Sequence, residues 1–147
     1  EHKFVKMSRR LLIHTNTAIK NKNVKDYRFK KNTSLITSVF TLQFIPKRYR
    51  YDILSKMYKS LNVGSALILC EKIALEQTVF RDMISSIHHD YKRQSFTCKD
   101  IMDKDISLRH MMKPYTRECM LNMLRDIGYT VEVFWQQHEF IGIIAIK

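Results

Sequence analysis

The stretch SSIHHDYKRQS, residues 85–95, gathers side chains that can carry acid–base chemistry or hold a metal ion. His88 and His89 are neighbours in the sequence, so on a helix they point about 100° apart and cannot hold one ion together. A zinc pair on a helix needs histidines at a spacing of four, and the residues at that spacing are cations. A metal site is therefore not expected. A histidine–aspartate general base stays open, as does a structural role in which Asp90 pairs with Arg93.

A second candidate is the stretch KRYRY, residues 47–51, which places cations beside aromatic rings. Single-stranded RNA binds such surfaces because bases stack on the rings while the cations neutralise phosphates. The alternative is the exposed start of a helix, and the sequence favours it. The residues that would contact RNA are Lys47, Arg48, Tyr49 and Arg50.

The positive charge of the chain is concentrated in its first third. The formal net charge is +12, and residues 1–50 hold 13 lysines and arginines against two acids. A field of this kind raises association with RNA and other anionic partners. The alternative is a drift in composition towards residues with A/T-rich codons, and the dispersed positions of the cations favour the drift. RNA stays an expected partner; DNA and a membrane do not.

Length, composition and apolar periodicity predict the elements that position these residues. With 147 residues, 45% of them apolar, and only three glycines and two prolines, the chain suits one α/β domain. The periodicity predicts, in order, a basic amphipathic helix near the N-terminus, a short strand at VKDYRF, a buried strand over 34–44, a helix opened by Pro46, a buried strand over 66–73, an irregular helical segment to 113, a helix over 115–128 and a terminal hairpin that turns at His138 and Glu139.

The order of these elements predicts the fold class. A strand, a helix and a second strand form a right-handed crossover, which makes the two strands parallel. We expect an α/β fold with parallel strands, crossover helices on both faces, a helical insertion and a C-terminal antiparallel hairpin. The whole chain would form one N-terminally incomplete domain, made of a basic helix and loop (1–31), a strand-helix-strand unit (32–73), a helical insertion (74–113) and a helix with the hairpin (114–147).

Four stretches resemble successive blocks of the carboxy-S-adenosyl-L-methionine synthase family. They are VFTLQF, SLNVGSALILCEKI, IHHDYKR and the ending VEVFWQQHEFIGIIAIK. The resemblance runs nearly without gaps from about Asn32 to Lys147 and covers the C-terminal portion of that family. It implies a partial Rossmann-like methyltransferase fold. It also implies a cytoplasmic transferase that uses prephenate to carboxylate S-adenosylmethionine for the modification of tRNA wobble uridines, and it favours a scaffold role for IHHDYKR.

The chain departs from the family at its ligand positions. The glycine-rich loop and the ribose-binding acid of such folds are absent from these residues. The family's later aspartate falls on Val24, and Asp26 reaches that position only with a shorter loop, so Asp26 is the candidate cofactor contact. Val39 replaces an asparagine. Asp105 replaces the arginine that receives the product's extra carboxylate, and Arg109 lies one helical turn away.

Two functions stay open at this point, and no catalytic residue is assigned. The first is the C-terminal part of a carboxy-S-adenosyl-L-methionine synthase-like enzyme, degenerate in this chain. The second is a non-catalytic structural or RNA-associated module. We expect S-adenosylmethionine or its carboxy form to bind only if the full-length protein is active, and neither cofactor nor metal to bind this chain alone. The strand over 34–44 would be an open sheet edge, which predicts a homodimer or another covering partner.

Overall fold

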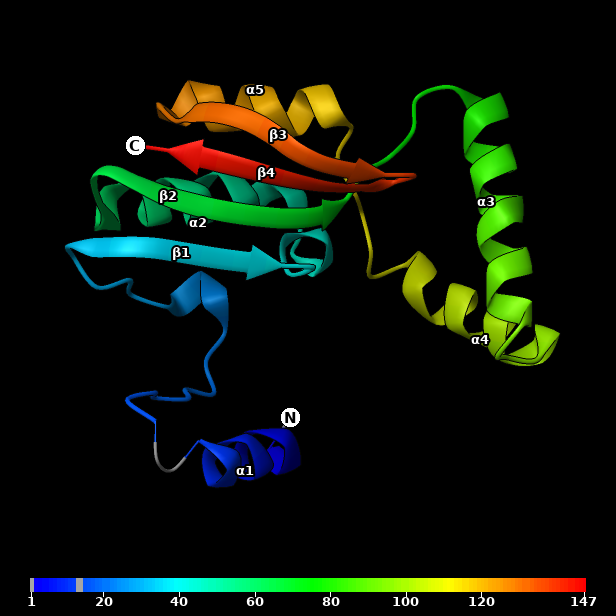
Figure 1. Cartoon of the computed structure of the whole chain (residues 1–147), viewed down its shortest axis with the longest axis horizontal. Helices are drawn as coiled ribbons and strands as arrows, with labels where there is room; N and C mark the ends of the chain where they lie inside the picture. The colour runs from blue at the N-terminus through cyan, green and yellow to red at the C-terminus, as the bar shows by residue number, and fades with distance from the viewer. Residues whose placement is uncertain (1, 13–14) are drawn as a thin grey trace.

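The computed structural model describes residues 2–12 and 15–147, and its centre is one four-stranded sheet. The strands are β1 (Thr33–Val39), β2 (Leu61–Lys72), β3 (Thr130–Gln137) and β4 (Phe140–Ile146), in the spatial order β1-β2-β4-β3. β1 and β2 are parallel, whereas β4 is antiparallel to both of its neighbours. The predicted combination of a parallel crossover and an antiparallel C-terminal hairpin is confirmed (Figure 1).

The helices lie in three places around the sheet. They are α1 (His2–Leu11), α2 (Lys47–Ser60), α3 (Thr78–Arg93), α4 (Cys98–Arg109) and α5 (Arg117–Ile127), with short 3-10 turns η1 (Val24–Asp26) and η2 (Leu42–Phe44). α2 and α5 cover one face of the sheet, α3 and α4 extend beyond the end where β2 finishes, and α1 stands apart below β1 (Figure 1). No helix among the described residues is long and apolar enough to cross a membrane.

Two predicted strands differ from the structure. VKDYRF contains the turn η1 and no strand. The strand expected over 34–44 ends at Val39, because Phe40 adopts a positive φ of 48° that turns the chain out of the sheet. A bulky residue in this region is strained, so the surrounding contacts must hold it there.

The core lies between the sheet and the pair α2 and α5. Alternate residues of a strand point to the same face, so Leu67 and Leu69 of β2 share a face with Ile141 and Ile143 of β4. All four are fully buried against apolar residues of the two helices, which include Ile53, Leu54 and Leu124. The helix pair and its apolar stripe follow the predicted periodicity.

The opposite face of the sheet is not covered by any helix in the part of the chain that the structure describes, so the prediction of helices on both faces is wrong. Leu35 and Val39 of β1 are each 55% exposed on this face. Phe134 is 56% exposed on the same face, with its ring over Gly142. β1 is an edge strand, as predicted; the covering partner itself stays a prediction.

Candidate functional site

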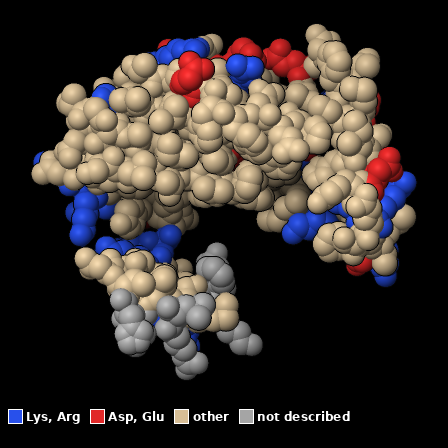
Figure 2. All heavy atoms as spheres, in the orientation of Figure 1, with Lys and Arg blue, Asp and Glu red and all other residues tan. Residues whose placement is uncertain are grey.

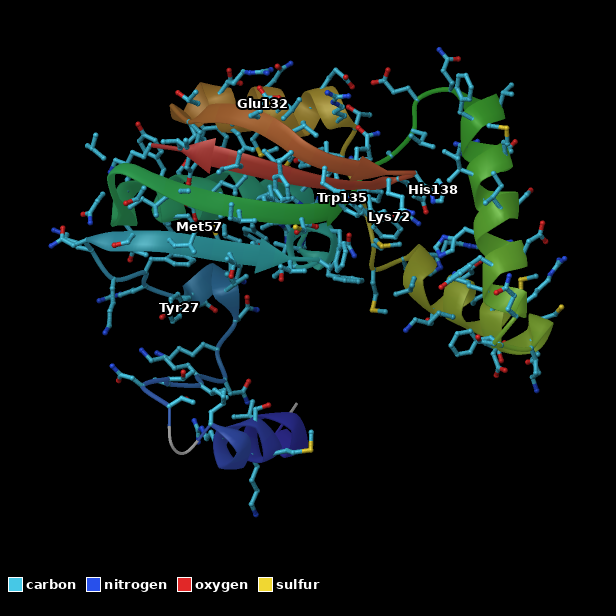
Figure 3. All side chains as sticks on the ribbon, in the orientation of Figure 1. Tyr27, Met57, Lys72, Glu132, Trp135 and His138 are labelled. Carbon is cyan, nitrogen blue, oxygen red and sulfur yellow. The ribbon has the colours of Figure 1, made fainter. Side chains whose placement is uncertain are left out.

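A cavity of about 380 Å³ lies where β1 and β2 end, between the sheet and the helical insertion. We call it the crevice. Its polar lining residues are Gln43, Lys72, Ser85, His88, His89, Lys92, Asp105, Arg109 and Glu139, and its apolar ones are Phe44, Leu108, Met112 and Phe140. Ligands of open α/β sheets bind at the carboxyl ends of the strands. The crevice is therefore the candidate functional site, and Lys72 marks its edge in Figure 3.

The floor of the crevice is fixed by the buried carboxylate of Glu71. The turn after Phe40 directs three successive backbone N–H groups at this carboxylate, from Thr41, Leu42 and Gln43 at 2.8–3.0 Å. The Gln43 side chain in turn accepts a hydrogen bond from the Lys72 N–H at 2.8 Å. These bonds fasten η2 to the end of β2, so the residues that follow β1 have one defined position.

Asp105 is the first of two carboxylates held inside the crevice. His89 Nε2 lies 2.8 Å from Asp105 Oδ2, and the nitrogen is the donor because a carboxylate only accepts. Lys92 Nζ lies 3.7 Å from the other oxygen of Asp105. The negative charge that replaces the family's arginine is therefore compensated by a lysine and oriented by a histidine. The structure joins His89 to Asp105, and leaves Asp90 to pair with Arg93 at 3.2 Å as predicted.

Glu139 is the second carboxylate, and it repeats the same arrangement from the hairpin turn. Lys72 forms an ion pair with Glu139, and His88 Nδ1 lies 3.9 Å from the same carboxylate oxygen. The sequence pattern predicts Glu139 only as a turn residue and gives Lys72 no role. A signal existed for Lys72, since it is the last residue of the buried strand β2, at the end of the sheet where ligands bind.

Arg109 supplies the uncompensated positive charge of the crevice. It lies one turn after Asp105 on α4 and lines the same cavity. No carboxylate among residues 2–12 and 15–147 forms an ion pair with it. An arginine without a partner can bind a carboxylate through two parallel N–H donors, so the crevice favours an anionic group at this point.

The environment of His88 lowers its pKa from the ordinary value of 6.5, mainly through burial, and Lys92 and Lys72 lower it further. The folded state therefore favours the neutral form of His88. Its contribution to the free energy of unfolding is fully present above about pH 6.5 and is lost as the pH falls through the lowered pKa. We expect the NMR titration midpoint of His88 to lie lower in the folded protein than in the urea-unfolded chain. A folded midpoint at or above the unfolded one would contradict this environment.

Asp26 and Val39 lie outside the crevice. Asp26, in η1, lines another cavity together with Tyr27, which Figure 3 labels below β1. Val39 ends β1 on the uncovered face, where it pairs with Cys70. The structure does not bring Asp26 to Asp105 or Arg109. Its role as a cofactor contact stays a prediction.

Arg50 cannot serve as the RNA contact expected of it, because its side chain is 1% exposed. Its guanidinium donates to the carbonyl oxygens of Ile45 at 2.8 Å and Gln43 at 3.2 Å, and lies 4.8 Å from the ring centroid of Tyr115. The side chain therefore connects α2 to the floor of the crevice. For Lys47, Arg48 and Tyr49, contact with RNA stays a prediction.

The described residues contain no group of three or more His, Cys, Asp or Glu side chains that could hold a metal ion. The crevice itself combines histidines, carboxylates and cations in close pairs. That chemistry suits the binding of a charged organic ligand, or proton transfer through His89, whose second ring nitrogen is not used by Asp105.

Curated proteins named carboxy-S-adenosyl-L-methionine synthase match most of this chain. The carboxy-S-adenosyl-L-methionine synthase of Staphylococcus epidermidis is 34% identical over 134 residues, which span 90% of this chain and 58% of that protein. The enzyme of the same name from Pseudoalteromonas translucida is 35% identical over 119 residues, or 80% of this chain and 49% of that protein. The chain is a relative of the carboxy-S-adenosyl-L-methionine synthases. It spans about half the length of these relatives, consistent with their C-terminal portion.

The fold comparison agrees with this relationship to carboxy-S-adenosyl-L-methionine synthases. The YcgJ protein of Bacillus subtilis superposes with a TM-score of 0.70 at 8% identity, covering all of this chain and 79% of that one. An O-methyltransferase family protein of Burkholderia thailandensis gives a TM-score of 0.64 at 14% identity, covering 97% and 40%. The chain therefore has part of the methyltransferase fold. No model of a protein family matches it.

Proposed function

We propose that this chain is the C-terminal part of a carboxy-S-adenosyl-L-methionine synthase-like transferase, which carboxylates S-adenosylmethionine with prephenate as the donor. The observation that carries the proposal is the 31–35% identity to enzymes of that name through 80–90% of the chain. The product would feed the modification of tRNA wobble uridines in the cytoplasm. The crevice at the carboxyl ends of β1 and β2 is where the ligand would lie.

Within the crevice, Arg109 would receive the extra carboxylate of the product. The family's arginine position is Asp105 in this chain, and its charge is offset by His89 and Lys92. Arg109 reaches the same cavity from the next turn of α4 and has no ion-pair partner among the described residues. A charge-assisted hydrogen bond of this kind contributes about 1.5–3 kcal/mol.

Two of the family's ligand positions, Val39 and Asp105 in this chain, support a degenerate enzyme. Val39 offers no polar atom where the family has an asparagine, and Asp105 cannot donate to a carboxylate. We therefore propose that the ligand binds more weakly here than in an enzyme with both polar residues. A homodimer, or another partner that covers the β1 edge, belongs to this proposal as well.

Calorimetric titration of the full-length gene product tests this function and the role of Arg109 together. S-adenosylmethionine and carboxy-S-adenosylmethionine should both bind. Arg109→Ala should weaken the carboxy form by about 10-fold or more and S-adenosylmethionine by less than about 3-fold, because only the carboxy form carries the extra charge. Lys99→Ala, at the exposed start of the same helix, is the matched control and should change neither affinity.

The outcomes separate the two functions. If the full-length product binds neither ligand, the transferase is ruled out and the non-catalytic module is supported. If Arg109→Ala weakens both ligands equally, the transferase stands but Arg109 does not read the extra carboxylate. In that case, Asp105→Arg should bind the carboxy form more tightly than the wild-type protein does, if the extra carboxylate can reach the family's arginine position.

A further inference from the structure

A second cavity, of about 520 Å³, lies at the opposite end of the sheet from the crevice. Five cations line it, and we call it the basic cavity: Lys25, Arg28, Lys31, Lys56 and Lys59. One wall is formed by η1 and the segment that leads from it into β1, and the other by the C-terminal end of α2. In Figure 2 lysine and arginine side chains gather on this lower side of the body, above α1.

The cations of the basic cavity come from two segments that lie side by side. Lys56 and Lys59 are three residues apart on α2, so they lie on one face of that helix. Lys25 lies in η1, and Arg28 and Lys31 lie in the irregular segment that leads from η1 into β1. Lys56 Nζ donates to the backbone oxygen of Lys25 at 3.4 Å, which links the two walls.

Most of this charge is uncompensated. Among the residues that the structure describes, ion pairing in the basic cavity is limited to Lys56, which meets Asp52 at 2.7 Å. Asp26 is the single acid of the lining, and no ion pair forms between it and the cations. Like charges gathered without counter-charges repel one another, and a multivalent anion relieves that repulsion.

Aromatic rings accompany the cations. Tyr27 is half-buried and meets Phe29 edge to face, with ring centroids 5.0 Å apart. Phe29 packs against the hydrophobic core and so fixes the position of Tyr27. Lys25 Nζ lies 4.8 Å from the ring centroid of Tyr49, which extends the combination of cations and rings along the surface to the start of α2. Cations beside accessible rings are typical of surfaces that follow a single strand of nucleic acid.

We propose that the basic cavity binds the phosphodiester backbone of a single-stranded nucleic acid, with Tyr27 available for stacking by a base. Five cations exceed what one phosphate ion needs, and they suit several successive phosphates. The site is independent of the proposed transferase function, because it lies at the amino ends of β1 and β2 whereas the crevice lies at their carboxyl ends. Figure 3 shows this separation between Tyr27 and Lys72.

The test compares two triple variants of equal charge by fluorescence anisotropy with a labelled oligouridylate of about 15 nucleotides. The first variant changes Arg28, Lys31 and Lys59 of the basic cavity to glutamine. The control changes Lys99, Lys104 and Arg125 to glutamine. All six side chains are exposed, so neither variant should lose folding stability, which circular dichroism melting checks.

At about 100 mM salt, the cavity variant should bind RNA about 10-fold or more weakly, and the control less than about 3-fold. The dependence of log affinity on log salt concentration should fall by about 2 in slope for the cavity variant, because each lost phosphate contact removes about 0.7. Equal binding of the DNA strand of the same sequence supports recognition of the shared backbone.

Several results would overturn the proposal. Equal losses in the two variants would assign binding to diffuse charge. Full competition by about 10 mM inorganic phosphate would make the basic cavity a site for a single ion. Binding to phosphatidylserine vesicles but to neither strand would replace the nucleic acid with a lipid surface. No anisotropy change with the wild-type protein would end the proposal outright.

Discussion

Glu71→Ala is expected to lower the free energy of unfolding by about 3–5 kcal/mol. The Glu71 side chain is 1% exposed and accepts hydrogen bonds from three consecutive backbone N–H groups, those of Thr41, Leu42 and Gln43. Truncation leaves these buried donors without partners, and each unsatisfied donor costs about 1–3 kcal/mol. The turn that begins at Phe40, whose φ is positive, would lose the hydrogen bonds that anchor the three residues after it.

Urea unfolding followed by circular dichroism measures this loss. Glu76→Ala is the matched control, because Glu76 follows the same strand but is exposed, and its effect should stay within about 0.5 kcal/mol. Glu71→Gln keeps one acceptor oxygen and should fall between the two. If Glu71→Ala is no more costly than the control, the backbone N–H groups of η2 have found water as a partner, and the floor of the crevice is not fixed by this carboxylate.

Leu67→Ala is expected to cost about 2–5 kcal/mol, whereas Leu35→Ala should cost less than about 0.5 kcal/mol. The two leucines lie on adjacent strands, where Leu35 pairs with Ala66 and Leu67 with Ile36. Leu67 is fully buried under α2 and α5, whereas Leu35 is 55% exposed on the uncovered face. The same substitution therefore leaves a cavity on one face of the sheet and removes a solvated side chain from the other.

The pair also reports on what covers the second face. Unfolding of both variants is compared at low and high protein concentration, because association stabilises by mass action. A large cost for Leu35→Ala at high concentration alone would indicate that a second copy covers this face. A large cost at every concentration would contradict the exposure of Leu35.

Much of the fold follows from local pattern. The periodicity of YTRECMLNMLRDIG predicts α5, and Gly128 ends it with a left-handed φ of 114° that glycine adopts readily. The alternating apolar residues after it, broken at His138 and Glu139, predict the hairpin β3–β4. The prediction of a strand at VKDYRF is wrong. The cations and aromatic rings of this stretch line the basic cavity and do not pair with another strand. The prediction of helices on both faces is wrong for a different reason. Periodicity shows that a strand is apolar on both faces, but it does not show what packs against each face.

The candidate sites needed the tertiary structure. The sequence singles out both His89 and Asp105. His89 belongs to IHHDYKR, and Asp105 occupies the position of an arginine in the family that the chain resembles. Their meeting depends on how α3 and α4 fold back on each other across residues 94–97. Arg50 shows the same limit, since its sequence neighbours suggest a surface patch while its guanidinium is buried against Gln43 and Tyr115.

The sequence by itself determined the order and type of the main elements and the relationship to carboxy-S-adenosyl-L-methionine synthases, because both depend on neighbouring residues in linear order. Only the tertiary structure decided which charges compensate one another. The charge of Asp105 is compensated, whereas Arg109 and most cations of the basic cavity form no ion pair among the described residues, and this difference depends on distances between helices and loops that are far apart in the chain. Short-range spacing carries no information on such distances, because they are set by how the elements pack around the shared core.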